Sequence, residues 1–254
     1  PGDVRLPSAL LEARFVRRLN RFAAIVTVGG TERMVHVANS GRMRELLQAG
    51  NRVLLAPVSS MGLKTTHYLA LVDLGHTLVS ADARLPPYLV HEALAEGRLP
   101  QFAGYTSFRR EVMFGESRLD LLLQGPQGQC YMEVKSVTLV EGGTGLFPDA
   151  PTIRGAKHVR SLAQALGEGH RAAVVFVVQR EDAAAFAPND AADPAFGEAL
   201  RLAHAQGVEV YAYRCRVSRG AVVLADQLPV CLRAPASVGP REKPGNQAPQ
   251  GISR

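Results

Sequence analysis

The residues best suited to chemistry lie between positions 108 and 138, where Glu111, Asp120, Glu133 and Lys135 stand among apolar residues. Divalent cations such as Mg²⁺ prefer oxygen ligands and are typically held by one or two carboxylates together with water and substrate phosphate. A lysine ammonium beside such a cation can position water or neutralise charge that develops on phosphorus. We therefore predict a Mg²⁺ or Mn²⁺ centre for phosphate chemistry, with Glu111, Asp120 and Glu133 as metal ligands and Asp120, Glu133 and Lys135 as catalytic residues.

Three antiparallel strands would bring the three acids together. Gly115-Glu116 suits a tight two-residue hairpin loop, and residues 125–128, Gly-Pro-Gln-Gly, suit a second connection of four residues. In the resulting register Glu111 faces Asp120, and Asp120 faces Glu133. The three carboxylates would then form one row across the three strands.

Strand side chains alternate between two faces, so Lys135 shares the face of Glu133. The opposite face is predicted to be apolar and to consist of Val112, Phe114, Leu119, Leu121, Leu123, Cys130, Met132 and Val134. Like charges directly opposed destabilise a sheet, and a bound cation would explain the row. The alternative is that the acids are solvated residues on the open side of the sheet.

Composition limits the class of protein. With 254 residues and 46% apolar content, the chain can bury one large core or two modest ones, and we predict two domains. The sequence contains neither a membrane-length apolar run nor a basic, apolar leader at its start, so we expect a soluble cytoplasmic protein without a membrane partner. Three cysteines, two of them in apolar strand-like runs, favour reduced thiols. The net charge of +6, mostly from arginine, permits a polyanionic partner, although genomic base bias explains it equally well.

The predicted fold class is α/β with a small β-barrel. After a loose lead-in at 1–12, residues 13–83 show four or five short strands and one short helix at 42–47, which suits an OB-like nucleic-acid-binding barrel. Residues 84–225 run helix, three antiparallel strands, helix and strand, the order of a mixed-sheet α/β domain. Residues 226–254 are rich in Pro, Gly, Gln and Arg and are predicted to be disordered.

OB barrels commonly bind single strands or oligonucleotides through a basic groove with stacking side chains. Phe22 or Tyr68 could stack, although Phe22 in the core is the alternative. DNA is the expected partner, RNA is its alternative, and a homodimer stays open. The residues expected to contact nucleic acid, with ordinary solvated positions as the alternative for the barrel arginines, are Arg14, Arg21, Asn39, Arg42 and Arg44 in the barrel and Arg154 and Lys157 in a later helix.

Two resemblances extend these expectations. Asp120, twelve residues and then Glu133-Val134-Lys135 resemble the D…(D/E)-x-K signature of the PD-(D/E)XK nuclease superfamily. The chain from about Arg14 to Val217 resembles the sugar fermentation stimulation protein A family, through the stretches RFAAIV, NSGRMRELL, EVMFGESRLDLLL, MEVKSVTL, LFPDAPTIRGAKH, VVFVVQR and GVEVYAY.

The family resemblance implies an amino-terminal OB-like domain, a PD-(D/E)XK nuclease-like domain, DNA binding and regulation of maltose metabolism. It also implies metal-site acids at Asp120 and Glu133. The chain departs from the family pattern at Ser40, where threonine is usual, and at Ile153, where glutamate is usual. Two functions therefore compete: a metal-dependent nuclease and a non-catalytic DNA-binding regulator of sugar metabolism.

Overall fold

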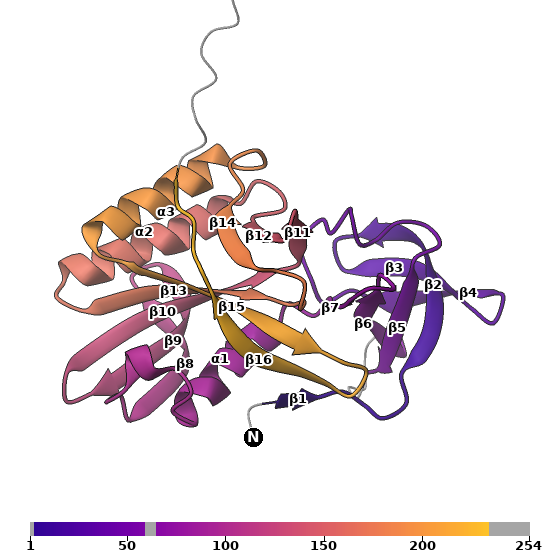
Figure 1. The fold of residues 1–254 in the computed structure, drawn as a ribbon, viewed down its shortest axis with the longest axis horizontal. Coiled ribbons are helices and arrows are strands. Elements are labelled where there is room, and N and C mark those ends of the chain that lie inside the picture. Colours follow the sequence, from indigo (N-terminus) through magenta and orange to yellow (C-terminus); the bar gives the residue numbers. More distant parts are fainter. Residues whose placement is uncertain (1–2, 59–64, 234–254) are drawn as a thin grey trace, which may run out of the picture.

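The computed structural model describes residues 3–58 and 65–233, which form a small barrel beside a larger layered domain (Figure 1). In the barrel sheet the strand order is β4-β3-β2-β5-β6-β7, and β4 also pairs with β6, so five strands close on themselves. The strands are β2 (Leu11–Asn20), β3 (Ala23–Val28), β4 (Thr31–His36), β5 (Arg52–Pro57), β6 (His67–Asp73) and β7 (Leu78–Ser80). The predicted barrel is confirmed.

Apolar residues at alternate positions fill the barrel. Phe15, Val26 and Val35 point inward from three successive strands, and Leu46 closes one end. The short helix predicted at 42–47 is wrong, because the segment makes a single hydrogen-bonded turn around Met43 instead. Met43 has a left-handed backbone with φ of 46°, which a continuous helix cannot contain.

The larger domain is built on a seven-stranded mixed sheet of order β1-β16-β15-β13-β10-β9-β8. Strand β13 runs parallel to both β10 and β15, as a helical crossover requires, and the remaining neighbours are antiparallel. The strands are β1 (Asp3–Arg5), β8 (Ser107–Phe114), β9 (Ser117–Gly125), β10 (Gly128–Val137), β13 (Arg171–Val178), β15 (Glu209–Val217) and β16 (Ala221–Leu228). This α/β mixed sheet confirms the predicted fold class.

Helices cover both faces of the sheet. Helices α2 (Ile153–Gly167) and α3 (Pro194–Gln206) lie along one face, and α1 (Leu85–Ala95) lies on the other (Figure 1). A three-stranded sheet of β11 (Leu139–Glu141), β12 (Thr144–Phe147) and β14 (Ala185–Pro188) completes the domain, with a short 3₁₀ turn at Pro100–Phe102. None of the helices in the described ranges has the length and apolar character that crossing a membrane requires.

The helices on the α2 side begin at side-chain caps. The Thr152 hydroxyl accepts the Gly155 N–H at the start of α2, and the Asp193 carboxylate accepts the Phe196 N–H at the start of α3. Helix α3 ends at Gly207, whose φ of 113° lies in the left-handed region that favours glycine. Local sequence therefore fixes where α2 begins, and α2 carries a side chain into the candidate site.

The predicted register of the three-strand meander is confirmed for the pairs Phe114 with Ser117, Val112 with Leu119, and Gln124 with Gln129. The second loop is tighter than expected, because Gly125 and Gly128 themselves pair. The pairing of β9 with β10 ends at Leu121 and Met132.

The single apolar face predicted for the meander is wrong. Leu121 and Met132 pack in the core on the α1 side, whereas Phe114 and Leu119 pack in the core under α2. The change of face occurs around Asp120, where the ladder between β9 and β10 has ended. Of these four residues, the two before Asp120 therefore face α2, and the two after it face α1.

The two ends of the described chain differ from expectation. Residues 3–5, expected in a loose lead-in, form β1 and pair with β16 of the larger domain. Residues 226–233, placed in the predicted disordered tail, continue β16 to Leu228, and the Cys231 N–H then bonds to the Phe186 carbonyl. In both cases the segment supplies hydrogen-bond partners to a neighbouring strand: residues 3–5 to β16, and Cys231 to β14. Residues 234–254 lie outside the described residues.

Candidate functional site

Two acids, a lysine and a histidine meet under α2, and we call Asp120, Glu133, Lys135 and His158 the acid centre. Strand β10 carries Glu133 and Lys135 two residues apart on the α2 face, and α2 contributes His158. One oxygen of Glu133, Oε1, lies 2.5 Å from Lys135 Nζ and 2.5 Å from His158 Nδ1. Two donors on one oxygen fix the orientation of the whole carboxylate.

The second oxygen of Glu133, Oε2, is buried and has no hydrogen-bond partner within the described chain. The residue is only 3% exposed, so water does not freely replace the missing partner. Burial alone would raise the pKa of Glu133, but the charge of Lys135 and the hydrogen bond from His158 lower it overall. An ionised carboxylate with one free oxygen therefore stands at the centre of the site.

Asp120 lies next to Glu133 where β9 leaves the ladder. Its Oδ2 accepts the backbone N–H of Val134 at 2.7 Å, so the side chain occupies the place of a strand partner. Burial and the neighbouring Glu133 charge together raise the pKa of Asp120 to about 7. In the metal-free protein the two acids repel each other, and the pair holds a proton near neutral pH.

His158 is the site residue that sequence reasoning did not single out. Its Nε2 lies 3.4 Å from Arg154 Nε, which can only donate, so Nδ1 carries the proton and donates to Glu133. His158 is 5% exposed. The signal available in the sequence was its place on the inward face of a helix, four residues and about one helical turn after Arg154.

Glu111 does not belong to the acid centre, and the predicted row of three acids is wrong at this position. Glu111 has a left-handed backbone with φ of 52°, and the pairing of β8 with β9 skips it. Its side chain is 64% exposed and points to Arg118, with 3.9 Å between the charged groups. Among the described residues, no group of three or more acidic, histidine or cysteine side chains is arranged to hold a metal ion.

A second site, the arginine groove, lies where the barrel meets residues 150–151 of the larger domain. It encloses about 700 Å³. Its lining contains five arginines and no acidic residue. In full the lining is Phe15, Val16, Arg17, Arg18, Leu19, Asn20, Arg21, Ser40, Gly41, Arg42, Arg44, Leu47, Ala49, Ala150 and Pro151.

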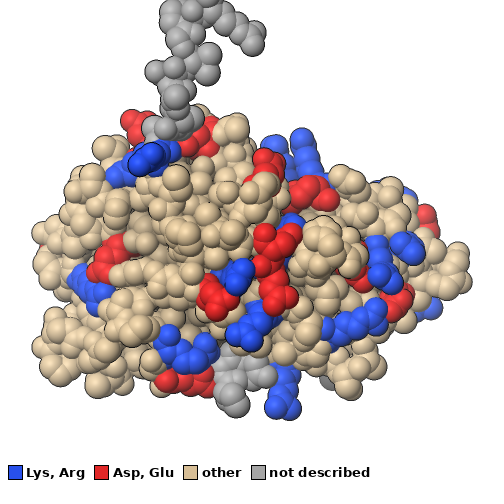
Figure 2. Space-filling model, in the orientation of Figure 1, with Lys and Arg blue, Asp and Glu red and all other residues tan. Residues whose placement is uncertain are grey.

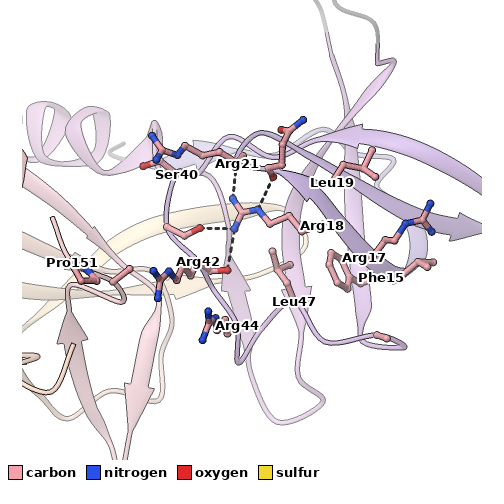
Figure 3. A pocket seen from close by; sticks show the side chains of 15 residues that line it. Phe15, Arg17, Arg18, Leu19, Arg21, Ser40, Arg42, Arg44, Leu47 and Pro151 are labelled. Carbon is pink, nitrogen blue, oxygen red and sulfur yellow. Dashed lines mark hydrogen bonds between the residues drawn. The ribbon is translucent and has the colours of Figure 1, made fainter. Parts of the chain in front are cut away.

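Arg18 is the fixed centre of this groove (Figure 3). Its guanidinium donates to the carbonyls of Asn20, Arg21, Asn39, Gly41 and Arg42 at 2.5 to 3.1 Å. Arg18 therefore joins the β2–β3 hairpin to the loop that follows β4, and burial lowers its pKa. All of its donors serve the protein.

The other arginines on the Pro151 side of Figure 3 are free to bind an anion. Arg21, Arg42 and Arg44 donate no side-chain hydrogen bond and form no ion pair with any other residue of the described ranges, and all three are exposed. Arg17, on the far side, lies 3.7 Å from Glu32. Three cations without a partner in the described ranges, in a recess whose lining contains no acid, form a ready anion site, while the nearby Asp149 carboxylate accepts the Met43 N–H.

Four other residues expected to contact nucleic acid lie outside this recess or are occupied. Asn39 is 7% exposed, and its side chain accepts the Gly41 N–H, so it shapes the loop rather than facing solvent. Arg14 lies outside the groove lining and donates to the Gly50 carbonyl. Lys157 is exposed and 3.3 Å from Glu116, and Arg154 contacts His158.

The surface charge does not single out another site on the face seen in Figure 2. Lys and Arg side chains are interspersed with Asp and Glu there, and much of the surface of the larger domain is uncharged. That face presents no continuous basic stripe.

The fold and the two sites define a class of protein: an OB barrel fused to a mixed-sheet domain that carries a D…E-x-K centre. Comparison with known families places the chain within that class. Residues 16–81 match the SfsA N-terminal OB domain, and residues 84–221 match the sugar fermentation stimulation protein RE domain. The chain belongs to the sugar fermentation stimulation protein family.

Related proteins align with this chain over almost their whole length. Sugar fermentation stimulation protein homologues from Desulforamulus reducens and Moorella thermoacetica are each 46% identical, covering 91% and 92% of this chain and 95% and 99% of their own. The solved structure of Pyrococcus furiosus SfsA in complex with Ca²⁺ is 30% identical, with a TM-score of 0.82, and covers 89% of this chain and 97% of its own.

Proposed function

We propose that the protein hydrolyses phosphodiester bonds of nucleic acid at the acid centre, with Mg²⁺ or Mn²⁺ as cofactor and DNA as substrate, RNA being the alternative. The observation that carries the proposal is the state of Glu133. Its carboxylate is buried, held through Oε1 by Lys135 and His158, and left without a partner at Oε2 beside Asp120. The large majority of buried side-chain oxygens have a hydrogen-bond partner, so an ionised buried carboxylate with one orphaned oxygen calls for a further ligand such as a cation.

The residues fit a divalent cation. Asp120 and Glu133 would hold it, and two carboxylates completed by water and phosphate are the usual ligand set of Mg²⁺ in proteins. Burial and the Glu133 charge raise the pKa of Asp120 despite the nearby Lys135, and a bound cation would favour the ionised form of both acids. The Pyrococcus furiosus relative was solved in complex with Ca²⁺, which supports divalent-cation binding by this protein.

A bound divalent cation supplies Lewis-acid polarisation of the phosphate and lowers the pKa of water. Lys135 is 12% exposed at its side chain and is the positive group that can stabilise charge on a phosphate oxygen. His158 keeps Glu133 oriented, and Arg154, exposed on the same helix, can hold a neighbouring phosphate.

The test is cleavage of end-labelled DNA and RNA by purified protein under single-turnover conditions, with EDTA, Mg²⁺, Mn²⁺ or Ca²⁺. Wild type should shorten at least one substrate with Mg²⁺ or Mn²⁺, and Asp120→Asn should not. Glu111→Gln is the matched control, because Glu111 is a nearby acid outside the centre, and it should cleave as wild type does. Cleavage that survives Asp120→Asn, or that Glu111→Gln abolishes equally, would refute the assignment.

A non-catalytic DNA-binding regulator is the second candidate. It is favoured by Arg21, Arg42 and Arg44, whose unpaired cations can bind a polyanion without any contribution from the acids. The same experiment separates the two functions. Binding without cleavage in any metal would support the regulator.

A further inference from the structure

We infer that the arginine groove binds a single, unpaired nucleic-acid strand and leads it toward the acid centre. The path to the acid centre rests on the proposed function, whereas the binding of a single strand stands on its own. Three independent features of the groove support it: its charge, its shape and the apolar side chains at its rim.

The charge of the groove fits a polyanion. The guanidiniums of Arg21, Arg42 and Arg44 have no partner in the part of the chain that the structure describes, and no acidic residue contributes to the lining. A guanidinium matches phosphate geometry with two parallel hydrogen bonds. Because Arg18 fixes the loop from residue 39 to residue 42, the cations of that loop need little ordering when a ligand binds.

The shape of the groove favours a single strand over a duplex. Three walls enclose it: strand β2, the loop of residues 40–49, and residues 150–151 of the larger domain. A volume of about 700 Å³ is that of a pocket for a small ligand, enough for a short stretch of strand. A double helix presents its phosphates on a wide convex surface and keeps its bases paired inside, so it could touch the exposed arginines but could not place bases in the recess.

The rim offers apolar surface to unpaired bases. Leu19 is 45% exposed and lines the groove, and Phe22 is 51% exposed directly after Arg21. The alternative that Phe22 lies in the core is therefore wrong. The Phe22 N–H donates to Asn20 Oδ1, which holds the hairpin turn that presents the ring. Phe22 lies outside the groove lining, one residue after Arg21, and an exposed aromatic ring near the groove is a platform for a base that is not paired.

The groove leads to the acid centre along the chain. Pro151 lines the groove, Arg154 follows three residues later, and His158 stands one helical turn further on. Three extended residues span at most about 10 Å and four helical residues about 6 Å, so the groove edge lies within about 16 Å of the backbone that carries His158. Glu133 is itself recessed at 3% exposure, and a narrow, flexible strand reaches it more readily than a duplex.

The test is fluorescence anisotropy in EDTA, so that binding is measured without hydrolysis. The probes are labelled single strands of deoxythymidine and uridine, a duplex of equal length, and a polyglutamate peptide. We expect the single strands to bind at least tenfold more tightly than the duplex and the peptide. The deoxythymidine and uridine arms decide between DNA and RNA. Equal affinity for duplex and single strand, or tighter binding of the peptide, would overturn the inference.

Variants locate the binding. Arg42→Ala and Arg44→Ala should each flatten the slope of log affinity against log salt by about 0.7, the value for one phosphate contact on a single strand. Phe22→Ala should weaken single-strand binding by about fivefold or more. The control is Arg33→Ala, an exposed barrel arginine outside the groove lining, which should bind as wild type does. Equal effects of Arg33→Ala and Arg42→Ala would overturn the groove assignment.

The two proposals fail separately. Tight single-strand binding in EDTA with no cleavage in any metal would refute hydrolysis and leave the groove assignment standing. Cleavage of single strands whose KM is unchanged in Arg42→Ala and Arg44→Ala, after equal thermal stability has been checked, would refute the groove and leave hydrolysis standing.

Discussion

Replacing Asp120 by asparagine should reveal the electrostatic stress of the metal-free acid centre. The pKa of Asp120 rises from its ordinary 3.8 to about 7, through burial and the charge of Glu133. At about 1.4 kcal/mol for each tenfold change in the proton equilibrium, the rise corresponds to about 4 kcal/mol. The asparagine oxygen can still accept the Val134 N–H, so the substitution removes the charge and keeps the hydrogen bond.

The sign of the effect follows from where the proton is held. Below the ordinary pKa of 3.8 both the folded and the unfolded chain hold the proton, and Asp120 adds no pH dependence. Between that value and about 7 the folded protein keeps the proton while the unfolded chain loses it, so the stability of wild type falls as pH rises. Asp120→Asn escapes this loss, and its stability relative to wild type should grow by up to about 4 kcal/mol over that range.

The assay is urea unfolding in EDTA at several pH values between about 4 and 8, for wild type, Asp120→Asn and the control Glu111→Gln. Glu111 is exposed, so its substitution should shift the stability of the protein by a small constant. A hundredfold excess of Mn²⁺ over Kd should then stabilise wild type by about 2.7 kcal/mol and Asp120→Asn by much less. Parallel pH profiles for wild type and Asp120→Asn, or equal responses to Mn²⁺, would refute the reasoning.

Four further substitutions test the site and the fold. Lys135→Ala should lower the single-turnover cleavage rate by roughly 10²-fold and leave the Mn²⁺-induced rise in Tm nearly intact, since lysine is not a metal ligand; an unchanged rate would exclude it from the chemistry. His158→Ala removes one of two donors to buried Glu133 Oε1 and should lower unfolding free energy in EDTA by about 1–3 kcal/mol, whereas a neutral result would contradict the hydrogen bond. Gly125→Ala places a Cβ 2.5 Å from the Gly104 carbonyl oxygen and should destabilise the protein in urea unfolding. Gly167→Ala, in open space at the end of α2, should instead stabilise it by about 0.5–1 kcal/mol, and the reverse order of stabilities would contradict the packing.

The local patterns of the sequence were enough to predict the strands and part of the site. Glycine loops and alternation predicted the register that places Asp120 beside Glu133, because loop length fixes register in a hairpin. They could not show that Glu111 turns away, since its left-handed backbone depends on tertiary context rather than on residue type. Nor could they place His158, which reaches Glu133 only because α2 packs over β10, a contact between elements distant in sequence.

The arginines illustrate a second limit of sequence reasoning. Arg18 and Arg42 look alike in a sequence, yet the first donates to backbone carbonyls, whereas the side chain of the second has no partner within the described ranges. The helix predicted at 42–47 failed for a related reason. The Asp149 carboxylate, more than a hundred residues away, accepts the Met43 N–H and stabilises a turn that local propensity did not predict.

The pairing of β1 with β16 makes the barrel an insertion within the larger domain. The sheet contains residues 3–5 at one edge, the chain then leaves to build the whole barrel, and it returns at α1. One core runs across the junction, since Leu54 and Leu71 of the barrel cluster with Leu89 of α1. If the backbone were cut between the barrel and α1, the two fragments would stay associated through the pairing of β1 with β16 and through the shared core. The arginine groove between them would therefore be retained.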